Sequence, residues 1–480
     1  METHRNTRTD IADADTFAPV DDGLRSADPL DFEGYADQLE AARHKTGVDE
    51  AVVAGPARIG GIDVELALFE FGFLGGSMGE VAGERIARAI ERAAERRVPF
   101  VLRTSTGGAR MQEGMRSLIQ MPKLVAARAE LARARRPFIA VLAHPTTGGV
   151  LASIGAIADI TVAEAGATIG FAGPRVAERF TGEPLPSGSH TATSAYSSGL
   201  VDELVPPSDV HAFVAGVLKT IADDDPEEVD VPPALETKPS DAWETVQLAR
   251  ATTRPRGPEL ARDSSDAFVE LRGDRAGTDD PSVMCALARI AGRRCLLIAI
   301  DRDIHPGPAA YRKAIRCIEV GGRLDVPVVT LVDSRGADPS SVSEAGGVAW
   351  HIAHLFETIL EAPVPVAAIV TGELGSGGSL AFAVGDEVVA YYDTIASVIG
   401  PEMAAEILWR APTRGPDAAR MLKLRASEAF DLDIVDWVVD AELNHESLRF
   451  VITDVIDRLS HLGVEDWSSA RRARWRGAGG

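Results

Sequence analysis

The stretch that decides the fold of this chain reads VPFVLRTSTGGAR from residue 98 to 110 and FIAVLAHPTTGGVLASIGA from residue 138 to 156. Each part begins with a strand-like apolar run and ends in a polar turn that contains two adjacent glycines. A helix of small, apolar residues is predicted directly after the second turn. The first N–H groups of a helix have no partner within the helix, so they can donate to a ligand oxygen. This order of strand, glycine turn and helix start therefore predicts a site for an anionic oxygen.

The glycines of the second turn, Gly148 and Gly149, suit that role because they lack a Cβ atom. Their backbone can adopt a positive φ, and a carbonyl oxygen can come within hydrogen-bonding distance of their amides. An enolate or a tetrahedral oxyanion would be stabilised by such donors. For a glycine pair taken alone, the alternative is a turn that only ends a strand.

The same order occurs a second time in the chain. Residues 326–337 read VPVVTLVDSRGA, and residues 365–383 read PVAAIVTGELGSGGSLAFA. Each copy then leads to a Gly-Pro turn, at residues 173–174 and 400–401. Self-similarity of this length indicates one fold used twice. We therefore predict an α/β protein with two similar domains.

Composition excludes several classes of function. The chain has 480 residues and a formal net charge of −23, which argues against a general partner among nucleic acids or anionic membranes. No uncharged apolar run approaches the roughly 18 residues of a spanning helix, and the N-terminus lacks an apolar signal region. The cysteines, Cys285, Cys295 and Cys317, are widely spaced and form no C-x-x-C pair, so no metal site or disulfide framework is indicated. We expect a cytoplasmic protein.

Composition also divides the chain into five segments. Residues 1–28 are polar and acidic and are expected to form a disordered tail. Residues 29–222 form the first domain, and the acidic, proline-rich residues 223–240 are expected to be a solvated linker. Residues 241–465 form the second domain. The arginine-rich residues 466–480 are expected to be a frayed tail.

Longer motifs resemble those of a known family. In the first half, FEFGFLGGSMG at 69–79, GGARMQE at 107–113 and GFAGPR at 170–175 closely resemble the β subunit of bacterial acetyl-CoA carboxylase carboxyltransferase. The second half resembles the α subunit, and the matching runs are ELRGDR at 270–275, GSGG at 375–378 and SVIGPE at 397–402. The resemblance covers roughly residues 28–440, and several long motifs in one order are far more specific than a lone glycine pair.

This resemblance implies two crotonase-like domains (the ClpP/crotonase superfold) built from repeated ββα units. In the family, carboxybiotin on a separate carrier protein gives its CO2 to the α-carbon of an acyl-CoA. One amide cradle holds the thioester oxygen as it becomes an enolate, and the other holds the ureido oxygen of biotin. Carried over by motif, Gly148 and Gly149 form the thioester hole, and Gly377 and Gly378 form the biotin hole. Few acid–base side chains are expected, because the chemistry is largely that of the cofactor.

Further residues of the same motifs are expected to line the sites for the CoA ester and biotin. They are Gly75, Gly76, Gly107, Gly108, Arg110, Gly173, Arg175, Arg335, Gly336, Gly375 and Gly400. Arg110 and Arg175 could pair with CoA phosphates, because a guanidinium fork suits phosphate. Salt bridges to the carboxylates of this acidic protein are the alternative. We expect His144, beside the first glycine pair, to bond the backbone rather than to act as a base.

The chain departs from the family pattern in ways that bear on cofactors and partners. It has no four-cysteine zinc ribbon, so no zinc is expected, and Arg335 stands where the family commonly has proline. It also has no biotin-acceptor motif and no biotin carboxylase region. The biotin carboxyl carrier protein and the biotin carboxylase are therefore expected on separate chains. The family further implies a homodimer, with active sites between the first half of one protomer and the second half of the other.

Three functions stay open. The first is a carboxyltransferase that converts acetyl-CoA to malonyl-CoA for fatty acid biosynthesis, or that acts on propionyl-CoA or a longer acyl-CoA. The second is a biotin-independent crotonase-like acyl-CoA decarboxylase or hydratase. The third is a non-catalytic scaffold subunit, which only the departure at Arg335 supports.

Overall fold

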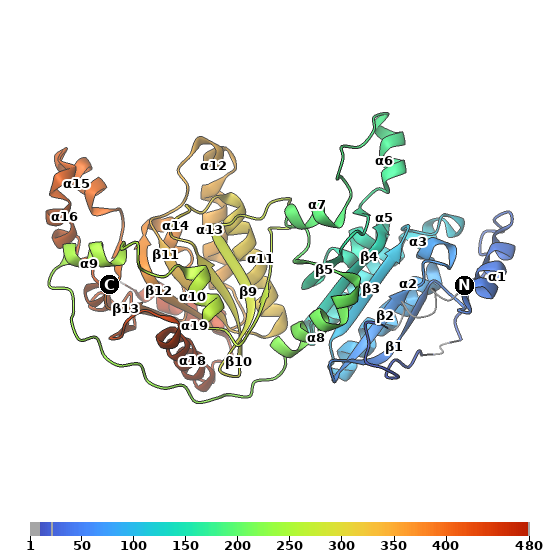
Figure 1. Cartoon of the computed structure of the whole chain (residues 1–480), viewed down its shortest axis with the longest axis horizontal. Coiled ribbons are helices and arrows are strands. Elements are labelled where there is room, and N and C mark those ends of the chain that lie inside the picture. The colour runs from blue at the N-terminus through green and yellow to red at the C-terminus, as the bar shows by residue number, and fades with distance from the viewer. Residues whose placement is uncertain (1–9, 21–22, 479–480) are drawn as a thin grey trace. The chain divides into compact units, whose positions relative to one another are not determined.

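The computed structural model describes residues 10–20 and 23–478 (Figure 1). The chain divides into two compact units, which we call unit 1 (Met1–Lys219 with Arg275–Gly277) and unit 2 (Thr220–Asp274 with Thr278–Gly480). The division falls close to residue 222, where the first domain was expected to end.

Unit 1 is built on a mostly parallel sheet. The strands run in the order β1 (Val52–Ile59), β2 (Ile62–Phe69), β3 (Phe100–Thr106), β4 (Phe138–Thr147), β5 (Ile160–Glu164) and β7 (Glu203–Val205), and β6 (Ile169–Gly170) pairs with β4. Only the first pair, β1 with β2, is antiparallel. The crossover connections between parallel strands require helices on the faces of the sheet, and helical segments occupy them.

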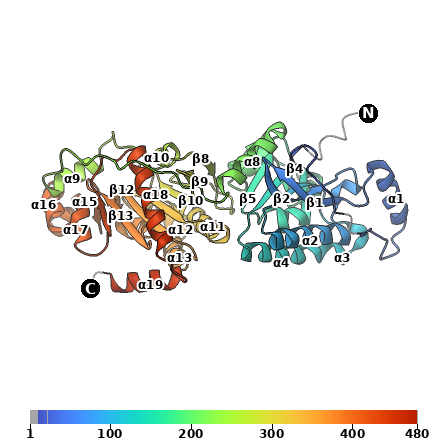
Figure 2. The ribbon, with the colours of Figure 1, turned by 90° about the horizontal axis from the view of Figure 1, so that it is seen from below.

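The helices of unit 1 follow from amphipathic patterns. They are α1 (Tyr35–Thr46), α2 (Glu80–Arg96), α3 (Met115–Leu118), α4 (Gln120–Arg133), α5 (Gly148–Val150), the π-helical turn η3 (Leu151–Gly155), α6 (Pro174–Thr181), α7 (Ala192–Ser197) and α8 (Val210–Thr220). In α2, Ile86, Ile90 and Ala93 recur at helical spacing and are buried in the core below the sheet. Figure 2 shows α2 and α4 together along one face of the sheet and α8 on the other.

Unit 2 repeats this plan with one more strand. The sheet order is β15 (Trp437–Val439), β13 (Glu387–Tyr391), β12 (Val366–Gly375), β11 (Val328–Ser334), β10 (Arg293–Ile300), β9 (Val283–Ile290) and β8 (Ala267–Glu270), and β14 (Ile395–Ser397) pairs with β12. Its helices are α9 (Ala242–Ala249), α10 (Gly257–Asp263), α11 (Pro308–Leu324), α12 (Ser341–Ala345), α13 (Val348–Leu360), α14 (Ser376–Leu380), α15 (Pro401–Trp409), α16 (Gly415–Met421), α17 (Ala426–Phe430), α18 (His445–His461) and α19 (Trp467–Gly477).

The two units are copies of one fold, as the sequence repeat predicts. The antiparallel pair β1 and β2 corresponds to β9 and β10, and the central strands β3 and β4 correspond to β11 and β12. The register shifts at the same point in both central pairs, after Thr104 in β3 and after Val332 in β11. After the shift, Thr106 pairs with Thr146 and Ser334 with Leu374, so the strand ends stay side by side up to the glycine turns.

The N-terminal segment differs from the expected disordered tail. Ala18 N donates to Pro56 O at 2.9 Å and Val20 N donates to Ala54 O at 2.9 Å, and Ile11 is buried. These contacts extend the edge of the sheet beside β1, which accounts for the order of residues 10–20. The remaining parts of the predicted tail, residues 1–9 and 21–22, lie outside the described residues.

The arginine-rich C-terminal segment is also not a frayed tail, because it contains α19. Arg471 on this helix is fully buried, and its Nη2 donates to Val364 O at 2.8 Å and to Asp386 Oδ2 at 2.6 Å. A buried guanidinium with a carboxylate and backbone carbonyls as partners fixes the helix to unit 2. Residues 479–480 of the predicted tail lie outside the described residues.

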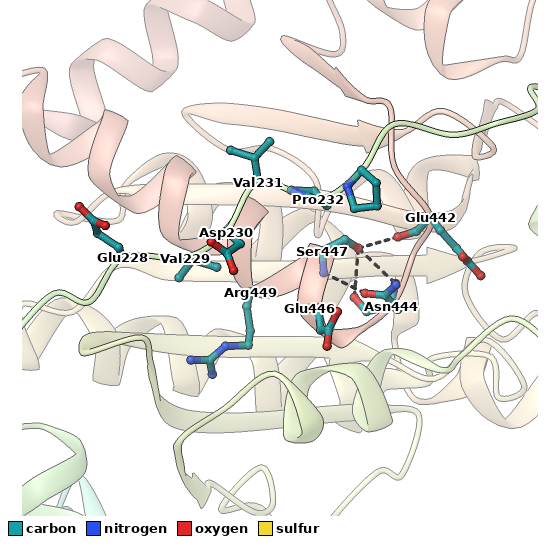
Figure 3. A pocket seen from close by; sticks show the side chains of 11 residues that line it. Glu228, Val229, Asp230, Val231, Pro232, Glu442, Asn444, Glu446, Ser447 and Arg449 are labelled. Carbon is teal, nitrogen blue, oxygen red and sulfur yellow. Dashed lines mark hydrogen bonds between the residues drawn. The ribbon is translucent and has the colours of Figure 1, made fainter.

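The acidic linker, residues 223–240, contains no helix or strand, as all of its described residues show, but it is not simply solvated. Asp225 N donates to Gly292 O at 3.0 Å and Glu227 N to Ala291 O at 3.0 Å, so the segment packs on the turn between β9 and β10. With the start of α18 it encloses a hollow of about 440 Å³ (Figure 3). None of the predicted site residues lines this hollow.

Candidate functional site

The structure brings the glycine turn after β3 into contact with the glycine turn after β4. Thr106 and Thr146, at the ends of β3 and β4, pair in register, and the turns follow directly. A Cβ atom on Gly148 would lie 2.8 Å from Gly108 Cα, and both residues have a positive φ, of +70° and +108°. Only glycine satisfies both conditions, so the close approach of the two backbones explains these residues.

The third turn, at Gly75 and Gly76, joins the same site. Gly107 N donates to Gly75 O at 2.9 Å, and Met78 N donates to Gly108 O at 2.8 Å. A Cβ atom on Gly76 would lie 2.0 Å from Ser105 O, so this turn is also held against the end of β3. Three glycine turns that are far apart in the sequence therefore form one backbone cluster.

Not every amide in this cluster is available to a ligand. Gly148 N donates to Phe171 O at 2.8 Å, and Gly108 N donates to Thr106 Oγ1 at 2.9 Å. The expectation that the Gly148 amide is an oxyanion donor is therefore wrong. Its left-handed conformation shapes the turn instead.

The amides of Gly149 and Ala109 remain available to a ligand. The Gly149 amide belongs to the first turn of α5, where an N–H has no partner within the helix. Neither it nor the Ala109 amide makes a hydrogen bond to another group in residues 10–20 and 23–478. A Cβ atom on Gly108, next to Ala109, would lie 3.6 Å from Gly149 N. The unbonded donors of Gly149 and Ala109 are therefore close together.

Unit 2 contains the same turn with a different register from the one the sequence motif suggests. Ser334 pairs with Leu374 as Thr106 pairs with Thr146, so Ser376 stands where unit 1 has Gly148. Ser376 has a φ of +67°, close to the +70° of Gly148. The counterpart of Gly149 is therefore Gly377 rather than Gly378.

The surroundings of the two glycines agree with this register. A Cβ atom on Gly377 would have no heavy atom within 4 Å, whereas one on Gly378 would lie 2.8 Å from Ala337 N and 2.8 Å from Tyr311 Oη. Gly377 therefore faces open space, and Gly378 packs against the protein, contrary to the expectation that both bind a ligand. Ala337, the counterpart of Ala109, was not predicted, although Gly-Ala follows both polar turns in the sequence.

Gly336 and Gly375 shape the turn of unit 2. Gly336 has a φ of +122°, and its amide donates to Ser334 Oγ at 3.1 Å, as Gly108 donates to Thr106. A Cβ atom on Gly375 would lie 3.0 Å from Arg335 Cα. These contacts reproduce the close backbone approach of unit 1.

Arg110 is placed in the interior and not at a ligand surface. Its Nη1 donates to Glu113 Oε1 at 3.1 Å and to Tyr35 Oη at 3.3 Å, its Nη2 donates to Ser77 O at 2.6 Å, and it also contacts the Glu50 carboxylate. Burial alone would lower the pKa of Arg110, but the bond to Glu50 and the nearby charges raise it. With every donor engaged by the protein, Arg110 cannot bind CoA phosphates as predicted. It ties the turn after Gly76 to the turn after Gly108.

The other two predicted arginines are exposed. Arg175 is the second residue of α6, whose N-cap is Gly173, and Gly400 caps α15 in the same way. The Arg335 side chain is 58% exposed, with its Nε 3.7 Å from Glu373 Oε2. These residues border the turns, and neither Arg175 nor Arg335 is buried as Arg110 is.

His144 bonds the backbone, as expected. Thr168 N donates to His144 Nδ1 at 3.2 Å, which connects the end of β4 to the segment before β6.

Asp333 is a buried carboxyl group immediately before the turn of unit 2. Its Oδ1 accepts a hydrogen bond of 2.9 Å from Glu373 N, and its Oδ2 has no partner among the described residues. Burial raises the pKa of Asp333, against the opposing effects of that bond and of the charges of Arg254 and Arg302. A Cβ atom on Gly372 would lie 2.2 Å from Asp333 Cγ, so glycine is required opposite the carboxyl group.

Within residues 10–20 and 23–478, no helix is both long and apolar enough to cross a bilayer. In the same part of the chain, no three histidine, cysteine, aspartate or glutamate side chains converge as metal ligands do.

The fold is that of the crotonase-like carboxyltransferases. The crystal structure of transcarboxylase 12S, with methylmalonyl-coenzyme A and methylmalonic acid bound, matches with a TM-score of 0.74 at 22% identity, over 94% of this chain and 89% of that one. The structure of a single-chain, multi-domain long-chain acyl-CoA carboxylase matches with a TM-score of 0.71 at 20% identity, over 94% of this chain and 46% of that one.

Sequence comparison identifies the family. Residues 237–477 match the family described as acetyl co-enzyme A carboxylase carboxyltransferase-like. The acetyl-coenzyme A carboxylase carboxyl transferase subunits beta/alpha of Salinispora tropica are 41% identical over 455 residues, which is 89% of this chain and 80% of the relative. Those of Parafrankia sp. are 36% identical, over 97% of this chain and 84% of the relative. The chain belongs to the acetyl-CoA carboxylase carboxyltransferase family, which confirms the predicted class of enzyme.

A relative with a different name extends the comparison. The "probable biotin-dependent acyl-coenzyme A carboxylase beta3 subunit" of Mycobacterium bovis is 36% identical, over 85% of this chain and 83% of the relative. Relatives of this chain are thus named both for acetyl-coenzyme A and, more generally, for a biotin-dependent acyl-coenzyme A carboxylase.

Proposed function

We propose that this chain moves CO2 from carboxybiotin, carried by a separate carrier protein, to the α-carbon of acetyl-CoA, giving malonyl-CoA. The observation that carries this proposal is the repetition of one turn geometry. In each unit, two amides beside the glycine turns make no hydrogen bond to the described residues: Ala109 and Gly149 in unit 1, and Ala337 and Gly377 in unit 2. Gly149 and Gly377 lie in the first turn of a helix. Carboxyl transfer from biotin to a thioester develops negative charge on two oxygens, so two amide cradles suit it.

In unit 1, the amides of Gly149 and Ala109 would donate to the thioester oxygen. As the α-carbon loses its proton, this oxygen takes up the negative charge of the enolate, and the two donors stabilise that charge. One such donor typically contributes about 3–4 kcal/mol to transition-state stabilisation. Burial of Arg110 with Glu50 keeps the neighbouring turns rigid, so the donors need not reorganise during the reaction.

In unit 2, the residues fit the ureido oxygen of biotin. A Cβ atom on Gly377 would have no heavy atom within 4 Å, and Ala337 N lies 2.8 Å from the position of a Cβ atom on the next residue, Gly378. Bound biotin would supply the carboxyl group and the base for the proton of the α-carbon. The exposed Arg335 side chain, where the family commonly has proline, would border this site.

We also propose that the chain acts as a homodimer. Large exposed apolar side chains occur on both helices that follow the Gly-Pro turns, Val176 and Phe180 on α6 and Ile407 and Leu408 on α15, and Phe180 is 91% exposed. Such patches commonly mark protein interfaces. Size-exclusion chromatography with light scattering should show a dimer, and a stable, active monomer would contradict the proposal.

The function is tested by incubating the protein with malonyl-CoA and either biotin or biocytin. We expect release of CO2 and acetyl-CoA that depends on the added biotin compound. A folded protein without this activity contradicts the proposal. Decarboxylation that proceeds equally well without biotin would indicate the biotin-independent alternative. No zinc is expected in the protein, and the biotin carboxylase and the carrier are expected on other chains.

A further inference from the structure

Arg250 connects three segments of unit 2 beside the amide cradle of Ala337 and Gly377. It is the C-cap residue of α9, and its side chain is 19% exposed. Its Nε donates to Glu373 Oε2 at 2.8 Å, and its Nη2 donates to Glu373 Oε1 at 2.8 Å. A guanidinium that bonds both oxygens of one carboxylate adds geometric specificity to the ion pair. Arg250 therefore fixes the orientation of the Glu373 carboxylate.

The remaining terminal nitrogen of Arg250 bonds the first turn of α15. Its Nη1 donates to Glu402 Oε1 at 3.0 Å and to Glu402 Oε2 at 3.1 Å. The strand that precedes α15, β14, pairs with the end of β12, where Glu373 lies. Arg250 thus closes a ring of contacts through β12, β14 and α15, and Gly377 follows Glu373 by four residues.

Glu373 is the point at which this ring meets the cradle. Its side chain is 3% exposed, and its backbone N donates to Asp333 Oδ1 at 2.9 Å. Arg335, whose Nε lies 3.7 Å from Glu373 Oε2, precedes Ala337 by two residues. Glu373 therefore contacts the turn that carries Ala337 and lies on the strand that leads to Gly377.

The ion pairs of Arg250 are not part of the fold that the two units share. In the register of the paired central strands, Pro145 of unit 1 stands in place of Glu373, and Gly107 stands in place of Arg335. Unit 1 therefore builds the same strand ends and turn without this carboxylate. An interaction that the shared fold does not need, and that lies beside one cradle only, indicates a role in that cradle.

We propose that Arg250 is a positioning residue for the amide cradle of unit 2. The inference rests on the proposed function, because it takes the Gly377 amide as a donor to the ureido oxygen of biotin. Arg250 acts through Glu373, because holding this carboxylate also holds the end of β12 and the helix start that follows it. Without Arg250, Glu373 keeps only the longer ion pair with Arg335 among the described residues. The strand end is then free to shift, and a misplacement of about 1 Å can lower a rate by about 10²-fold.

The test is the biotin-dependent decarboxylation of malonyl-CoA by the full chain, with the concentration of biocytin varied. Arg250→Met removes the guanidinium, and we expect kcat/KM for biocytin to fall by about 10- to 100-fold. The dissociation constant of malonyl-CoA, measured by isothermal titration calorimetry without biotin, should stay at the wild-type value, because the thioester cradle is in unit 1. The same titration counts the binding-competent molecules, so a loss of folded protein cannot be mistaken for a lower rate.

Arg293→Met is the matched control. Arg293 also lies in unit 2 and also bonds both oxygens of a carboxylate, because its Nε donates to Asp457 Oδ1 at 2.7 Å and its Nη2 donates to Asp457 Oδ2 at 2.7 Å. It joins the start of β10 to α18, and neither element carries a residue of the cradle. The control should lose stability but keep the wild-type kcat/KM for biocytin.

Arg250→Lys is the second variant and replaces Arg250→Met if that protein does not fold. It keeps a positive charge beside Glu373 but lacks the planar fork that bonds both oxygens, so kcat/KM for biocytin should fall below the wild-type value. A wild-type kcat/KM in the folded Arg250 variants, an equal loss in Arg293→Met, or a matching loss of affinity for malonyl-CoA would overturn the inference. If the wild-type chain shows no biotin-dependent decarboxylation, the proposed function itself fails. An active wild-type chain whose rate the Arg250 variants leave unchanged would remove only the positioning role.

Discussion

Replacing Gly377 by alanine separates the amide cradle of unit 2 from the stability of the fold. A Cβ atom at this position would have no heavy atom within 4 Å, and Gly377 is not among the glycines with positive φ. Alanine is about 0.5–1 kcal/mol more favourable than glycine inside a helix, so Tm should stay the same or rise. A methyl group beside the amide keeps the ligand oxygen from reaching it. Because one oxyanion donor contributes about 3–4 kcal/mol, we expect kcat to fall by about 10²–10³-fold.

The assay is the biotin-dependent decarboxylation of malonyl-CoA, with thermal unfolding measured on the same samples. Gly378→Ala is the comparison, because its Cβ atom would lie 2.8 Å from both Ala337 N and Tyr311 Oη. That variant should lower Tm, whereas Gly377→Ala should not. If Gly377→Ala retained more than half of the wild-type kcat, the assignment of this amide to the transition state would be refuted.

Three further predictions concern buried charges. Arg110→Met leaves the Glu50 carboxylate buried without its arginine partner, so the free energy of unfolding in urea should fall by about 3–5 kcal/mol. Adding Glu50→Gln should recover part of this loss. A loss below about 1 kcal/mol would contradict the prediction. Because the folded pKa of Asp333 is raised, its ionisation opposes folding as pH rises through that pKa. Asp333→Asn should therefore gain stability relative to wild type towards neutral pH and lose that advantage below the unfolded pKa of 3.8; a pH-independent difference in urea unfolding would contradict this. Arg471→Met unpairs Asp386 and backbone carbonyls, so the amides of α19 should exchange hydrogen faster, and unchanged exchange would show that the helix is held otherwise.

The strand and turn order could be predicted from the sequence because it depends on local patterns. Apolar runs followed by glycine turns are visible in both halves, and the same patterns give the parallel sheets of the two units. The register between the halves could not be predicted in the same way. The motif GSGG contains three glycines. The strand pairing of Ser334 with Leu374 and the φ of Ser376 show that a serine occupies the position of Gly148.

Arg110 shows why site roles were harder to predict than elements. Its partners Tyr35 and Glu50 lie 75 and 60 residues away in the sequence, so no local pattern distinguishes this buried cluster from a phosphate site. Arg471 is similar, because its carboxylate partner Asp386 lies 85 residues away. In both cases an arginine-containing segment that was expected to face solvent or a ligand is fixed by long-range ion pairing.

The most direct test of the central claim is a crystal structure with a CoA thioester bound. The account predicts the thioester oxygen at about 2.7–3.1 Å from the amide nitrogens of Gly149 and Ala109, the usual distance for such donors. A thioester bound in unit 1 with its oxygen beyond hydrogen-bonding distance of both amides would contradict it.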